Sequence, residues 1–111
     1  MKNILSIDVE DWFHILGLQS TPDVGGWKSL ESRVRENFRA LLGVLDKTNT
    51  KATCFFLGWV AERFPEIVRE ASQMGHEIAS HGYSHQLVFT QSQQEFTEDI
   101  RRAKQILEGI T

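Results

Sequence analysis

The chain has 111 residues, of which 41% are apolar and 24% are charged, and its formal net charge is −3. This length suits one small domain with its own core, and the charge argues against nucleic acid as a partner, because nucleic-acid binding needs a basic patch. No window approaches the roughly 20 apolar residues of a membrane span. The single cysteine, Cys54, lies in an apolar run and has no second cysteine with which to form an internal disulfide.

The N-terminal segment, MKNILSIDVEDW, predicts a buried strand over residues 4–7. It lacks the long apolar region and the small-residue cleavage site of a signal peptide, so we expect a cytoplasmic chain. Residues 9–28 contain three glycines and a proline and show no lasting period. They predict a long loop, which in a compact domain is usually functional or disordered.

A helix is predicted next, with Ser29 and Ser32 as candidate N-caps. Its apolar residues recur at helical spacing, at Val34, Phe38, Leu41, Leu42 and Leu45. Residues 52–57, ATCFFL, predict a second strand.

The segment after Gly58 predicts a short helix, a break before Pro65, and a second helix with Pro65 in its first turn and Gly75 at its end. Residues 76–80 predict a third strand. A final helix follows, capped by Thr90 or Ser92. This alternation predicts an α/β fold with a parallel sheet, either open or closed into a barrel. Because the sequence stops just after a helix, with Gly109 placed to lead into a further strand, we expect only the first βα units of such a fold.

Two polar clusters follow predicted strands. Asp8, Glu10 and Asp11 come after the first strand, and His81 and His85 come after the third. The ends of parallel strands converge on one face of the sheet, so these residues are expected to meet there. Two imidazoles and one carboxylate are a normal ligand set for a catalytic zinc ion. Alone, a His-x-x-x-His pair is weak evidence, and an acidic triplet is more often a solvated turn.

The stretch KATCFFLGWVAERFPEIVREASQMGHEIASHGYSH resembles the polysaccharide deacetylase family, also called carbohydrate esterase family 4 or the NodB homology domain. The family motif His-(Ser/Thr)-x-x-His appears here within GHEIASHGYSH, with glycine at its second place. The motif Thr-Phe-Asp-Asp-Gly is represented by SIDVEDW, a variant similar to a subgroup associated with exopolysaccharide and cell-surface glycans. Complete domains of this family are roughly twice as long, so residues 1–111 resemble the N-terminal part, before the later motifs.

The resemblance implies a distorted parallel (β/α) barrel and metal-dependent removal of N-acetyl groups from a polysaccharide or glycan. It implies that Asp8 is the general base and that His81 and His85 bind a divalent metal, which we expect to be zinc. In the family the metal carboxylate directly follows the base, whereas here Val9 intervenes. Strand alternation favours Glu10 as the ligand, whereas a turn starting at Val9 favours Asp11. We favour Asp11 slightly, because exchanging aspartate for glutamate changes the side-chain length.

Other residues near these motifs are candidates for substrate contacts. Trp12 and His14 lie in the long loop, where they are expected to line a sugar-binding groove, although an aromatic or histidine there also suits a packing role. Tyr83 lies between the two histidines and is a further candidate for substrate binding or for support of the site. His76 and Trp59 are expected to pack.

Two alternative functions stay open at this point. One is a metal-independent amidase of the same superfamily, against which the two histidines argue. The other is a non-catalytic, truncated module that binds glycan or metal. We expect this chain alone to be inactive, and to self-associate through an exposed sheet edge and apolar helix faces.

Overall fold

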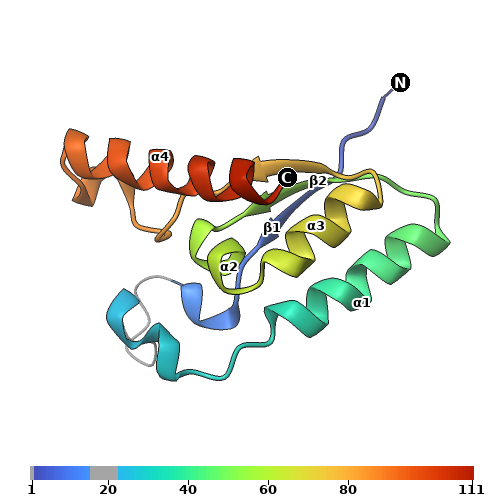
Figure 1. The fold of residues 1–111 in the computed structure, drawn as a ribbon, viewed down its shortest axis with the longest axis horizontal. Helices are drawn as coiled ribbons and strands as arrows, with labels where there is room; N and C mark the ends of the chain where they lie inside the picture. Colours follow the sequence, from blue (N-terminus) through green and yellow to red (C-terminus); the bar gives the residue numbers. More distant parts are fainter. Residues whose placement is uncertain (1, 16–22) are drawn as a thin grey trace.

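The computed structural model describes residues 2–15 and 23–111, and it shows an α/β fold with three parallel strands (Figure 1). Strands β1 (Ser6–Val9), β2 (Thr53–Phe56) and β3 (Glu77–Ser80) lie in the order β1-β2-β3. The helices are α1 (Val34–Lys47), α2 (Gly58–Arg63), α3 (Pro65–Gln73) and α4 (Gln93–Ile110). Short 3-10 helices span Trp12–His14, Val24–Ser29 and Val88–Thr90. The predicted strand–helix alternation is therefore confirmed.

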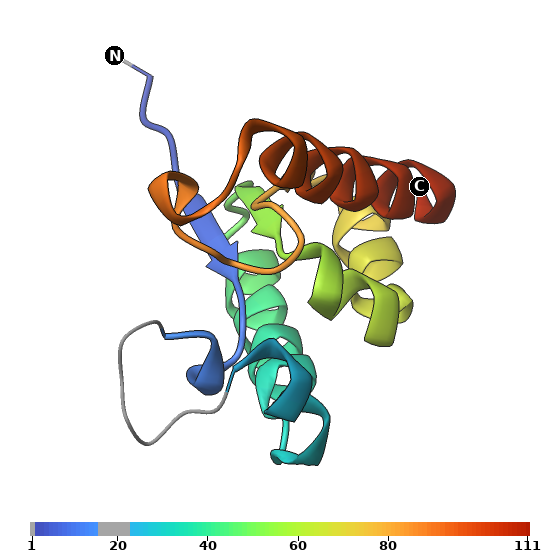
Figure 2. The ribbon, with the colours of Figure 1, turned by 90° about the vertical axis from the view of Figure 1, so that its left-hand side faces the viewer.

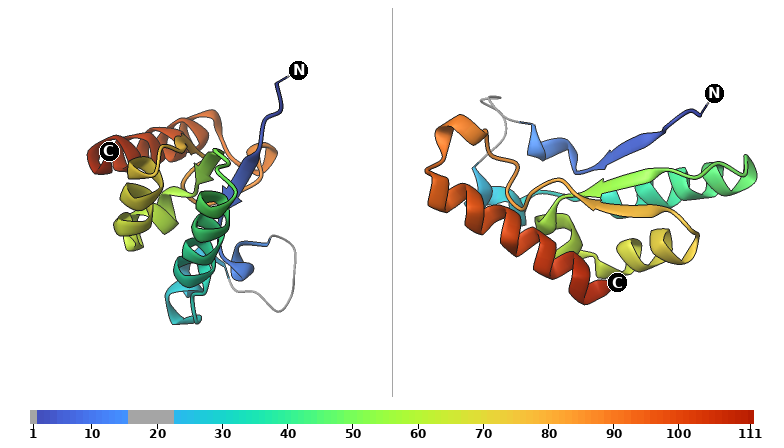
Figure 3. Two further views of the ribbon diagram at one scale, coloured as in Figure 1. Left: turned by 90° about the vertical axis from the view of Figure 1, so that its right-hand side faces the viewer. Right: turned by 90° about the horizontal axis from the view of Figure 1, so that it is seen from above.

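The four α-helices lie on one side of the sheet (Figure 3). On that side Val9, Cys54 and Phe56 are buried, and they join a core to which all four α-helices contribute. The alternate residues Asp8 and Glu77 point to the other side and are exposed. A sheet with one helix-covered face and one open face is what the first units of a (β/α) barrel present, because the helices form its outer ring.

Pro65, Gly75 and Ser92 mark helix ends as predicted. Pro65 begins α3 after the break at Phe64, and Gly75 follows the end of α3 with a φ of +87°, a conformation that glycine adopts without steric cost. Ser92, rather than Thr90, caps α4: its hydroxyl accepts a hydrogen bond from Glu95 N, and Glu95 accepts one from Ser92 N. Helix α4 runs through Gly109, which therefore does not lead out of the helix.

Two further local predictions are wrong. The first strand is two residues later than predicted, because Ile4 is 88% exposed and pairing with β2 begins at Ser6. Neither Ser29 nor Ser32 caps α1, whose N-cap is Arg33 without a side-chain hydrogen bond. Within the described ranges, no helix is long and apolar enough to span a bilayer.

Candidate metal centre

The carboxyl ends of β1 and β3 bring Glu10, His81 and His85 together. One ligand atom of each lies within 4.8 Å of the others. His85 Nε2 lies 3.0 Å from Glu10 Oε2, and His81 Nε2 lies 3.7 Å from the same oxygen. In Figure 2 the segment that follows β3 passes beside the end of β1, which is how residues more than 70 positions apart meet. The predicted convergence is thus observed for Glu10 of the first cluster and for both histidines of the second.

These atoms approach one another without hydrogen bonds. Glu10 Oε2 and His81 Nε2 are buried, and neither has a hydrogen-bond partner among the described residues. Buried polar atoms are normally paired, so such orphaned atoms require an explanation, and a bound cation is one. Two imidazole nitrogens and a carboxylate oxygen match the protein ligands of an open zinc site. The residues present therefore fit a divalent metal.

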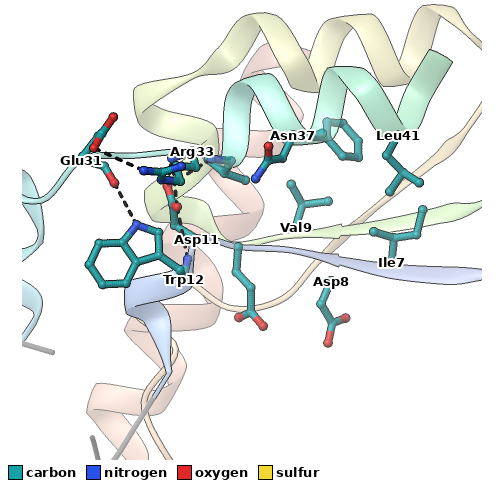
Figure 4. Close-up of a pocket in the computed structure, with 12 residues that line it drawn as sticks. Ile7, Asp8, Val9, Asp11, Trp12, Glu31, Arg33, Asn37 and Leu41 are labelled. Carbon is teal, nitrogen blue, oxygen red and sulfur yellow. Dashed lines mark hydrogen bonds and ion pairs between the residues drawn. The ribbon is translucent and has the colours of Figure 1, made fainter. Parts of the chain in front are cut away.

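Asp8 lies beside this cluster on the open side of the sheet. Its Oδ2 is 3.8 Å from His81 Nε2, and its side chain is 56% exposed. Figure 4 shows Ile7 and Val9 pointing toward α1, whereas Asp8 points away from that helix. Strand alternation places Glu10 on the same side as Asp8, two residues further along.

Asp11, the ligand that we slightly favoured from the sequence, is engaged elsewhere. Its side chain accepts hydrogen bonds from the Ser32 hydroxyl and from the backbone N–H groups of Arg33 (3.1 Å) and Val34 (3.4 Å). It also accepts one from Trp12 N at 3.2 Å, and it is only 4% exposed. Asp11 thus satisfies the donors at the start of α1 that Ser29 and Ser32 were expected to cap. The carboxylate that joins the histidines is Glu10.

His14 is not an exposed substrate contact, because its side chain is completely buried. The ring packs against Trp27, Trp59 and Phe13, with centroid distances of 4.4, 5.1 and 4.6 Å. Its Nδ1 accepts a hydrogen bond from Asp11 N at 2.7 Å. Burial lowers the pKa of His14 to about 4, so the ring is neutral at neutral pH.

The backbone of His14 nevertheless serves the site. His85 Nδ1 lies 2.7 Å from the His14 carbonyl oxygen, and that oxygen can only accept, so Nδ1 carries the proton and Nε2 faces Glu10. Metal-binding histidines commonly donate their second N–H in this way, which fixes the ring and its tautomer. Nothing in the local sequence pointed to this contact.

The Tyr83 side chain is likewise buried, with 8% exposure. It therefore has a supporting role in the site and is not placed to contact a substrate. Its hydroxyl donates to Glu62 at 2.6 Å, and the Arg102 guanidinium lies 3.7 Å from its ring centroid. Burial, and then the bond to Glu62, raise the pKa of Tyr83 to about 12. The same bond is the main cause of the lowered pKa of Glu62.

Trp12 is the one predicted substrate contact that is exposed, at 47%. Its indole Nε1 donates to the Glu31 carbonyl at 2.9 Å, which fixes the ring at the edge of a cavity of about 440 Å³ (Figure 4). Asp8 and Glu10 line the same cavity, as do residues of α1. His76 and Trp59 pack as expected: both are buried, and His76 Nδ1 accepts a hydrogen bond from Ala52 N.

Comparisons with known proteins place this site in a family context. A family model described as "Polysaccharide deacetylase" matches residues 21–111. A peptidoglycan-N-acetylglucosamine deacetylase of Bacillus cereus is 39% identical over 70 residues, which are 63% of this chain and 26% of that protein.

Solved structures give the same result. The crystal structure of the Bc1960 peptidoglycan N-acetylglucosamine deacetylase matches 97% of this chain, with a TM-score of 0.73 and 29% identity. A polysaccharide deacetylase from Mycobacterium smegmatis, described as putative, matches 96% of this chain, with a TM-score of 0.76 and 25% identity. The chain spans 40% and 38% of those two chains.

Proposed function

Since the chain belongs to the polysaccharide deacetylase family, we propose that it carries the metal-binding part of the active site of a metal-dependent glycan de-N-acetylase. One observation supports this most directly. Ligand atoms of Glu10, His81 and His85 converge within 4.8 Å, while Glu10 Oε2 and His81 Nε2 are buried without hydrogen-bond partners among the described residues. In this proposal the metal is zinc, because two imidazoles and one carboxylate are a common set for catalytic zinc.

A divalent metal at such a site lowers the pKa of a coordinated water and polarises the substrate carbonyl. Among the residues of this chain, Glu10, His81 and His85 would hold it. Asp8 would act as the general base: its carboxylate is 56% exposed and lies 3.8 Å from His81 Nε2, so it is accessible to a water at the same place. His85 would be held in the productive tautomer by the His14 carbonyl.

The substrate in this proposal is an N-acetylated polysaccharide, either an exopolysaccharide or another cell-surface glycan. Trp12 supports a sugar ligand, because its exposed indole ring lies beside Asp8 and Glu10 on the 440 Å³ cavity and can cover the apolar face of a sugar ring. The Bacillus cereus relative acts, by its name, on peptidoglycan. The cytoplasmic location and the self-association expected from the sequence both stay predictions. For self-association, β1 and β3 each pair on one edge only within residues 2–15 and 23–111.

Titration of the purified chain with zinc by calorimetry tests the proposal. Wild type should bind one ion, and Glu10→Gln, His81→Ala and His85→Ala should each weaken binding by at least about 100-fold, more than the loss of a supporting residue does. Glu31→Gln is the control, since that side chain is 79% exposed and, among the described residues, forms an ion pair with Arg33 alone. Failure of the wild type to bind zinc, or equal binding by all variants, would contradict the proposal.

A further inference from the structure

The segment between the two histidines is held by groups that are distant in sequence. It adopts unusual backbone conformations: φ is +75° at Gly82 and +54° at His85. The second value is uncommon for a residue with a side chain, so the surrounding structure must impose it. The positions of both imidazoles depend on this backbone, because His81 begins the segment and His85 ends it.

On one side the carbonyl groups of the segment accept hydrogen bonds from the start of α2. Gly58 N donates to Gly82 O at 2.7 Å, and Trp59 N donates to Tyr83 O at 3.2 Å. Gly58 itself is required by close packing, since a Cβ there would lie 2.7 Å from Tyr83 Cδ2. These contacts fix the carbonyl side of the segment.

On the other side the N–H groups of the segment converge on Asp99 of α4. Asp99 Oδ2 accepts from Tyr83 N at 2.8 Å, and Oδ1 accepts from Ser84 N at 3.1 Å and from the Ser84 hydroxyl. A carboxylate that accepts three bonds from one short segment makes strong, charge-assisted contacts. The next contact along the chain is the bond from His85 Nδ1 to the His14 carbonyl.

We propose that Asp99 is the positioning residue of the metal centre: it fixes the backbone between His81 and His85 and so sets the separation and direction of the two imidazoles. This inference rests on the proposed function, because it concerns ligands of the proposed metal. Among the described residues, the hydrogen bonds of Asp99 to this segment come from Tyr83 and Ser84, and none joins it to either imidazole. The short sequence motif around the histidines gives no sign of it, since Asp99 lies 14 residues beyond His85.

Zinc affinity of the purified chain, measured together with circular dichroism, tests the role of Asp99. Asp99→Ala should weaken zinc binding by about 10–100-fold, as loss of a residue that orients ligands does. Asp99→Asn should also weaken it, because its amide must place an N–H against either Tyr83 N or Ser84 N. Glu98→Gln removes the same charge from the neighbouring position, where the side chain accepts a hydrogen bond from Gln94, and should bind zinc as wild type does.

The outcomes separate the possible roles. Zinc affinities of Asp99→Ala and Asp99→Asn within about threefold of wild type would overturn the proposal. If Asp99→Ala loses its helical circular dichroism, Asp99→Asn decides, since it preserves the shape of the side chain. Amide hydrogen exchange of the metal-free chain adds a second readout: residues 82–86 should exchange faster in both variants while α2 stays protected. If wild type binds no zinc, the proposed function fails, and unchanged exchange in residues 82–86 would overturn the Asp99 proposal independently.

Discussion

In the loop after β1, several hydrogen-bond donors converge on one buried carboxylate, that of Asp11. In the segment after β3, the hydrogen bonds are divided between helices α2 and α4. Asp11 accepts from Trp12 beside it and from Ser32, Arg33 and Val34 at the start of α1. Residues 82–84 are held by α2 through their carbonyls and by Asp99 of α4 through their N–H groups. The loop after β1 is therefore held by Asp11, the neighbour of the proposed ligand Glu10. The segment after β3 is held by residues of α2 and α4, which are distant in sequence from His81 and His85.

The largest expected effect is on the catalytic step, because the proposed general base, Asp8, lies on β1. In a polypeptide with the complete domain, Asp8→Asn should lower deacetylation by about 10²–10⁴-fold, the usual contribution of a general base. Zinc content should be unchanged, because Asp8 is not in the converging ligand set. Metal analysis and turnover on an N-acetylated oligosaccharide measure both. Near-normal turnover would exclude Asp8 as the base.

Loss of Asp11 should give the largest loss of stability. Asp11→Ala leaves several donors at the start of α1 and at Trp12 without their acceptor, and we expect a loss of about 3 kcal/mol in the free energy of unfolding, from unsatisfied donors and a lost helix cap. Asp23→Ala is a matched control, because Asp23 precedes a 3-10 helix without a side-chain capping bond. Urea unfolding measures the difference. Equal stability of the two variants would show that Asp11 does not hold its loop.

A single methyl group added at Gly58 of α2 should disturb the segment that follows β3. In Gly58→Ala the new Cβ would lie 2.7 Å from Tyr83 Cδ2 and 3.0 Å from Ala103 Cα, so we expect a loss of about 1–3 kcal/mol from overpacking. Gly43→Ala in α1 is the control: apart from the backbone of α1 itself, no atom of the described residues lies within 4 Å of a Cβ there, and alanine should stabilise that helix by up to about 1 kcal/mol. Thermal unfolding of both variants measures the two changes in stability. Changes of the same sign in Gly58→Ala and Gly43→Ala would contradict the prediction.

The smallest effect is expected away from both loops, at His76. Burial, with a further contribution from Lys51, lowers the pKa of His76, while Asp46 opposes the shift. The neutral ring accepts a hydrogen bond from Ala52 N. Its contribution to stability should therefore be complete above the unfolded pKa of about 6.5 and should decrease as the pH falls below that value, because the unfolded chain takes up the proton first.

Unfolding in urea at pH 7.5 and at pH 5.5 tests this expectation for His76. Wild type should lose more stability over this interval than His76→Gln, which lacks the titrating group. Other groups whose pKa values are shifted, such as His14, are present in both proteins and cancel in the comparison. An equal loss in the two proteins would show that His76 is not responsible.

Much of the fold could be predicted from local pattern. Helical spacing from Val34 to Leu45, the break before Pro65 and the Ser92 cap are signals carried by neighbouring residues, and the structure confirms them. The convergence of the β1 and β3 ends also followed from parallel topology. Local signals failed where the partner was distant: Asp11 is bonded to residues 21–23 positions away, and Asp99 to residues 15 and 16 positions away.

The choice between Glu10 and Asp11 shows this limit most clearly. Strand alternation favours Glu10, whereas the side-chain length of an aspartate favours Asp11. The sequence around these acids could not reveal that the start of α1 takes up the Asp11 carboxylate. Burial of His14 and Tyr83 was equally hidden, because each is enclosed by residues from other elements.

The buried Val9 between the two acids has a consequence for recognising such sites in other sequences. It points into the core, so the pleat of β1 turns Asp8 and Glu10 to one side, about 7 Å apart along the strand at roughly 3.3 Å per residue. A search that requires two adjacent acids would match Glu10 and Asp11 here and would leave Asp8 out. A search for acids separated by one apolar residue at a strand end, with an aspartate next that can cap a later helix, would detect it.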